Sequence, residues 1–152
     1  TDPAVAGGGY FADLASHGFD LFQYLLGDIV EVAGFTARQA GLYAAEDAVS
    51  ASWRFASGAL GMGCWSFVAD RREDRVEIIG SQGRIGFSVF DEHPVELHAD
   101  EHISLEISHH EHIQWHHVLG MNAQIRGESR HPAVAAEALK TDWVMDQILK
   151  RY

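Results

Sequence analysis

The chain has 152 residues, of which 47% are hydrophobic and 22% are charged, a composition typical of one folded globular domain and not of a disordered chain. Its formal net charge of -11 would repel phosphate backbones and anionic lipid surfaces, so we expect neither nucleic acid nor a membrane as a partner. The single cysteine, Cys64, cannot form an internal disulfide, and no segment is typical of a signal peptide or a transmembrane helix, which favours a cytoplasmic protein.

The first predicted element is a helix from Phe11 to Leu26. Apolar residues recur there at intervals of three and four, which indicates one buried stripe. The stripe consists of Phe11, Leu14, Ala15, Gly18, Leu21, Phe22 and Leu25. Gly27 is a natural end for this helix, and the run Gly7-Gly8-Gly9 precedes its start.

Beyond Gly27, short runs rich in β-formers predict a series of strands. These runs cover 29–40, 48–56, 59–69, 75–80, 84–90 and 95–99. The compact glycine-bearing connections at 56–58 and 80–83 favour hairpins, and therefore an antiparallel sheet. Apolar side chains alternate in the fourth and fifth runs, so we expect one face of this sheet to be buried.

The tail is predicted to be helical over 112–126 and again from Pro132 to Tyr152. We therefore predict a single α+β domain over 1–152, an open and predominantly antiparallel β-sheet with helices packed on one face. The uncovered face of such a sheet needs a partner. We expect a second copy of the chain, in a homodimer or a tetramer, or another domain.

Three polar residues of the first helix, Asp13, His17 and Asp20, project opposite its apolar stripe because they lie three and four residues apart. A carboxylate beside an imidazole can orient the ring and raise its proton affinity, which suits proton exchange near neutral pH. The alternative is a solvated helix face that carries an ordinary ion pair, and spacing alone favours this alternative.

The sequence around these residues resembles a known family. The segment Gly7-Gly8-Gly9-Tyr10 through Asp13, His17 and Asp20, followed by Leu25-Leu26-Gly27, is similar to the start of the second domain in the glucose-fructose oxidoreductase and inositol dehydrogenase (Gfo/Idh/MocA) family. The family pattern is a glycine-rich turn, Asp-x-Gly-x-His-x-x-Asp, then Leu-x-Gly; this chain has Ala15 in place of the glycine. Segments 53–61, 78–85 and 137–149 also resemble the family, so the similarity covers nearly the whole chain.

The resemblance implies a C-terminal domain like that of glyceraldehyde-3-phosphate dehydrogenase, preceded in the full-length protein by a Rossmann domain that binds NAD or NADP. It implies that Asp13 binds a hydroxyl of a sugar, polyol or related substrate and that His17 accepts its proton. Gly8, Gly9, Tyr10 and Asp20 would border the substrate. A lysine of the missing domain completes the set, and the chain starts at Thr1 without methionine, so we expect an inactive part of a longer enzyme.

The sequence also allows three alternative interpretations. Gly7-x-Gly9-x-x-Ala12 fits a loosened dinucleotide fingerprint, but no strand is predicted before it. The stretch His109–His117 contains His112 and His116 at a zinc-ligand spacing, although an ordinary helix is favoured and we predict no metal ligands. A noncatalytic ligand-binding or dimerisation module of the same fold also remains open, because fold alone does not establish activity.

Overall fold

The computed structural model describes Val5 and residues 7–150, which divide into two compact units. The first unit contains the chain up to Asp70 together with the segment from Pro132 onward, and the second contains Arg71–His131. Each unit has its own antiparallel sheet, with the order β1-β2-β3 in the first and β4-β5-β6-β7 in the second. The predicted α+β class is confirmed, while the one sheet that we expected is divided into two.

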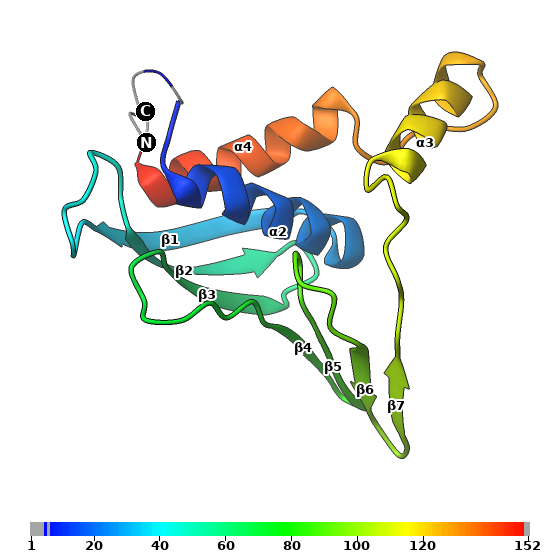
Figure 1. Cartoon of the computed structure of the whole chain (residues 1–152), viewed down its shortest axis with the longest axis horizontal. Coiled ribbons are helices and arrows are strands. Elements are labelled where there is room, and N and C mark those ends of the chain that lie inside the picture. Colours follow the sequence, from blue (N-terminus) through cyan, green and yellow to red (C-terminus); the bar gives the residue numbers. More distant parts are fainter. Residues whose placement is uncertain (1–4, 6, 151–152) are drawn as a thin grey trace. The chain divides into compact units, whose positions relative to one another are not determined.

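Among the described residues of the first unit, two helices lie on one face of a three-stranded sheet (Figure 1). Its elements are α2 (Tyr10–Leu26), β1 (Ile29–Ala37), β2 (Ala48–Phe55), β3 (Leu60–Ser66) and α4 (Ala135–Leu149). Helix α2 begins one residue before its predicted start and ends where predicted. Helix α4 begins three residues after Pro132, and the predicted end at Tyr152 lies outside the described residues.

Strand β2 is the centre of this sheet, and its side chains alternate strictly between the core and solvent. Its buried positions are Val49, Ala51, Trp53 and Phe55. The Trp53 indole lies across β3 at Gly61, where an added Cβ would be only 2.2 Å from the indole Nε1. Glycine at this position therefore lets a large aromatic ring lie flat on the sheet under the helices.

The core between helices and sheet is largely aromatic. Phe11 of α2 meets Trp65 of β3 edge to face with ring centroids 5.0 Å apart, and Phe19 meets Trp53 in the same way at 5.0 Å. Such pairs add about 0.5–1.5 kcal/mol beyond the burial of their apolar area. Because both phenylalanines face the sheet, the phase of α2 is fixed and its opposite side must face away from the core.

A single amide connects α2 to its two neighbours in the fold. The Gln23 side chain donates from Nε2 to Oγ1 of the buried Thr141 on α4 at 3.1 Å. Its Oε1 accepts a hydrogen bond from the backbone N–H of Ile29, at the start of β1, at 3.3 Å. These two bonds satisfy polar groups at the edge of the core and hold the end of α2 in place.

The loop between β1 and β2 is organised by the buried carboxylate of Asp47. Its oxygens accept hydrogen bonds from the backbone N–H groups of Gln39, Ala40 and Gly41, at 2.6, 2.9 and 3.3 Å. The bond from Gln39, supported by the others, holds the pKa of this carboxyl below its ordinary value of 3.8. The ionised form of Asp47 therefore stabilises the folded loop.

We expect Asp47→Asn to lower the Tm at neutral pH and to reduce the loss of stability in acid. The folded pKa is depressed, so the contribution of the carboxylate is present above the ordinary pKa and is lost as the pH falls through the folded value, below about pH 4. Thermal unfolding across this range should show a flatter pH dependence in the variant. Equal acid sensitivity of the two proteins would contradict this assignment.

The second unit contains β4 (Val76–Gly80), β5 (Gly83–Phe87), β6 (Val95–His98), β7 (His102–Leu105) and α3 (Trp115–Ile125). Strand β7 was not predicted, because the four residues of its His-Ile-Ser-Leu run are too short a signal beside a histidine-rich segment. Helix α3 was predicted from His112 but begins at Trp115, and none of its residues is buried. Because α3 buries no residue, its sequence has only a weak apolar stripe from which to predict where the helix begins.

The single cysteine, Cys64, is exposed because it lies on the outward face of β3, between the inward positions Gly63 and Trp65. None of the helices in the described part of the chain has the length and apolar character needed to span a bilayer.

Candidate active site on helix α2

The predicted acid and base lie on one side of α2, away from the core. The buried residues of this helix are Phe11, Ala15, Gly18 and Phe19. Asp13 and His17 are exposed, and Asp20 is half-buried. All three residues therefore lie on the side of α2 that faces away from the sheet.

The glycine turn before the helix fixes where α2 begins. Gly8 and Gly9 are both buried, and a Cβ added to Gly9 would lie 2.6 Å from Cβ of Ala45. Glycine is therefore required for the close approach of this turn to the 44–47 loop. The backbone N–H of Asp13 donates a hydrogen bond to the carbonyl oxygen of Gly9 at 3.3 Å. The glycine turn therefore also provides the first acceptor of the helical hydrogen bonds in α2.

Tyr10 stands at the first position of α2 and is 44% exposed. Its ring contacts Tyr43 edge to face at a centroid distance of 5.7 Å, and Phe67 at 5.8 Å. The hydroxyl at the end of the ring can exchange hydrogen bonds with a bound molecule, while these contacts hold the ring itself.

Two polar groups near this turn were missed in the sequence. The Tyr43 hydroxyl and the Glu46 Oε1 are buried and make no hydrogen bond within the described residues. Burial raises the pKa of Tyr43 above its ordinary value of 10.0, so this phenol is protonated at neutral pH. Both residues lie in an irregular loop, where no periodic pattern distinguishes a functional side chain from a solvated one.

The histidine-rich stretch does not have the geometry expected of a zinc site. Because α3 begins at Trp115, His112 precedes the helix and the pair His112 and His116 is not held one helical turn apart. Instead, His110 stacks on Trp115 with centroids 5.1 Å apart, and its ring lies 5.9 Å from that of His116. These imidazoles serve as aromatic surface groups.

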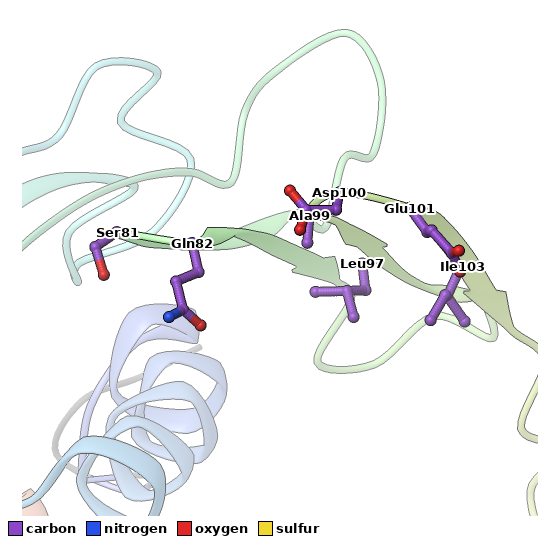
Figure 2. Close-up of a pocket in the computed structure, with 7 residues that line it drawn as sticks. All are labelled: Ser81, Gln82, Leu97, Ala99, Asp100, Glu101 and Ile103. Carbon is purple, nitrogen blue, oxygen red and sulfur yellow. The ribbon is translucent and has the colours of Figure 1, made fainter.

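A shallow depression on the second unit contains none of the predicted site residues (Figure 2). Leu97 and Ile103 are cross-strand partners, so their side chains lie on the same face of the β6–β7 hairpin. No lining residue is a histidine, lysine or cysteine, so the depression offers no base suited to neutral pH. It is lined by Ser81, Gln82, Leu97, Ala99, Asp100, Glu101 and Ile103.

Comparison with known proteins connects this geometry to a family. The model of the GFO/IDH/MocA C-terminal domain matches residues 1–86, more than half of the chain. Oxidoreductase P35 from Formosa agariphila is 31% identical over 90 residues, which cover 59% of this chain and 27% of that protein. The matched region includes the glycine turn, α2 and the whole sheet of the first unit.

Solved structures share the fold over almost the whole chain. A levoglucosan dehydrogenase in complex with NADH and levoglucosan superposes with a TM-score of 0.75 at 20% identity, covering 97% of this chain and 50% of that one. The WlbA dehydrogenase from Bordetella pertussis, in complex with NADH and UDP-GlcNAcA, gives 0.68 at 24% identity, covering 94% and 42%. The chain therefore spans half or less of the length of these relatives. The family match over residues 1–86, on a fold shared with these dehydrogenases, shows that this chain belongs to the GFO/IDH/MocA C-terminal domain family.

Proposed function

We propose that the full-length protein is an NAD- or NADP-dependent oxidoreductase of a sugar, polyol or related hydroxylated substrate, and that this chain is its substrate-binding domain. The observation that carries the proposal is an exposed face of α2 with Asp13 and His17, four residues apart, in a chain of an oxidoreductase family. Two structural relatives were solved with NADH and a sugar ligand.

In this proposal the residues of the chain handle the hydroxyl group of the substrate. Asp13 accepts a hydrogen bond from a substrate hydroxyl and holds the reacting alcohol in place. His17 accepts the hydroxyl proton on a ring nitrogen as the C–O bond becomes a carbonyl. The nicotinamide supplies the complementary chemistry, since it takes the hydride that leaves the alcohol carbon.

The described residues do not themselves form a dinucleotide site. Every strand pair among them is antiparallel, whereas dinucleotide binding on a glycine-rich loop uses a parallel βαβ unit. Gly9 of the glycine turn is also packed closely against Ala45. We therefore propose that the coenzyme is bound by the remainder of the protein, and that the chain alone does not turn over substrate.

The test is reduction of NAD⁺ and NADP⁺ by the full-length protein across a panel of sugars and polyols, with the isolated chain assayed in parallel. We expect turnover of at least one substrate by the full-length protein and none by the chain alone. Failure to reduce either coenzyme with any hydroxylated substrate would favour the noncatalytic binding module.

We also propose that the outward face of the β1-β2-β3 sheet is covered by a second copy of the protein. Phe35, Leu60 and Met62 are 77%, 79% and 85% exposed there, and a large apolar patch of this kind typically marks an interface. Sedimentation of the full-length protein as a monomer would contradict this assembly.

A further inference from the structure

The β6–β7 hairpin has two chemically different faces. Glu96 and His98 lie two residues apart on β6 and therefore share a face. In the antiparallel register His102 of β7 is opposite His98, and Ser104 is opposite Glu96. Four polar residues thus form one face. The other face carries Val95, Leu97, Ile103 and Leu105.

Three of the polar side chains converge. The His102 Nε2 contacts the Glu96 Oε2, and the rings of His98 and His102 are parallel with centroids 4.4 Å apart. One nitrogen from each imidazole and one oxygen from Glu96 all lie within 4.8 Å of one another. Four-coordinate zinc with bonds near 2.1 Å holds its ligand atoms about 3.4 Å apart, so small side-chain rotations bring the three into range.

The carboxylate of this cluster is already prepared to bind a cation. The Ser104 hydroxyl donates to the Glu96 Oε1 at 2.6 Å, which leaves the Oε2 directed at the imidazoles. A hydrogen-bonded partner that orients a ligating carboxylate is a usual feature of metal sites.

The cation on the strand next to His98 is directed at another carboxylate. Arg84 of β5 is the cross-strand partner of His98, but its guanidinium Nε lies 3.6 Å from Glu77 Oε1 on β4. Its charge is thus directed toward a neighbouring carboxylate. The chain as a whole carries a formal charge of -11, which favours the approach of a cation.

We propose that Glu96, His98 and His102 bind one divalent transition-metal ion, with Zn²⁺ as the reference, and that solvent fills its remaining positions. Two imidazoles and one carboxylate suit zinc and its neighbours, whereas magnesium and calcium prefer oxygen alone. The ion joins β6 to β7 across the turn at 99–101. It thereby stabilises β7, which is the edge strand of its sheet.

The test is calorimetric titration of the chelator-treated full-length protein with Zn²⁺ alone. We expect one ion per chain, with a Kd of the order of micromolar. His98→Ala and His102→Ala should each weaken binding by about 100-fold or more, a larger loss than that of an outer partner. The near-isosteric Glu96→Gln preserves the hairpin shape and should also weaken binding.

The matched control is the double substitution His112→Ala and His116→Ala, which removes two exposed imidazoles from the histidine-rich stretch of the same unit. Binding should be unchanged in this control. The proposal is overturned if the wild-type protein takes up no Zn²⁺, or if the control loses the ion while His98→Ala and His102→Ala retain it. Circular dichroism of each variant confirms that the fold is retained.

Discussion

Replacing His17 by alanine in the full-length protein is expected to lower kcat/KM for the alcohol substrate by about 10²-fold or more. The residue is exposed on the outer face of α2, so the substitution removes the proposed base without creating a cavity in the core. The measurement is steady-state coenzyme reduction under conditions where wild type turns over. Asp13→Asn should raise KM as well, because its carboxylate is proposed to hold the substrate hydroxyl.

The control is His116→Ala on α3, another exposed histidine to which the proposed reaction assigns no part. Its kcat/KM should equal that of wild type. An unchanged rate in His17→Ala would remove this imidazole from the chemistry. A loss of similar size in both variants would indicate a general effect of histidine removal.

Phe19→Ala is expected to destabilise the first unit by about 3–5 kcal/mol, the usual range for deletion of a buried phenylalanine ring. The side chain is fully buried and contacts both Trp53 and Trp65, with ring centroids 5.0 and 5.6 Å away. Its loss leaves a cavity where α2 meets the sheet. The midpoint of urea unfolding, followed by tryptophan fluorescence to which Trp53 and Trp65 contribute, should fall.

Tyr24→Ala is the matched control on the same helix, because the Tyr24 side chain is 70% exposed. Its unfolding midpoint should change little, within about 0.5 kcal/mol, as for other surface positions. If Phe19→Ala were no more destabilising than Tyr24→Ala, the proposed packing of α2 on the sheet would be wrong.

The helices of the first unit could be predicted because their periodicity is strong. Phe11, Ala15 and Gly18 of the predicted stripe are buried, whereas Leu25 at its end is exposed. Thr141, Met145 and Ile148 of the tail helix are buried as well. Phe19 was missed from the stripe, although it lies next to Gly18 on the same side. The buried face of a helix is wide enough to include residues that do not follow the strict spacing of three and four.

The second unit could be predicted less well, because its elements bury little. All four side chains of β7 are exposed, so hydrophobic alternation gives only two apolar positions from which to infer a strand. The division into two sheets depends on which strands pair with one another. The alternation of apolar residues within a single strand does not predict its partner strand. The cluster of Glu96, His98 and His102 was therefore missed, since His98 and His102 come together only through the register of β6 with β7.

The candidate active site could be located on α2 because three polar residues repeat at helical spacing and because the surrounding motif resembles a family. Asp13 and His17 are exposed and Asp20 is half-buried, and none of the three is among the core residues of α2. Tyr43 and Glu46 could not be found in this way. The path of an irregular loop brings both residues close to the glycine turn. The spacing of residues along the sequence does not predict such a path.

A structure of the full-length protein with coenzyme and a sugar or polyol substrate would decide whether this helix face meets the reacting group. We predict a His17 ring nitrogen within about 3 Å of the hydroxyl oxygen that loses its proton. A substrate bound elsewhere, with Asp13 and His17 facing bulk solvent in the complete protein, would contradict the account.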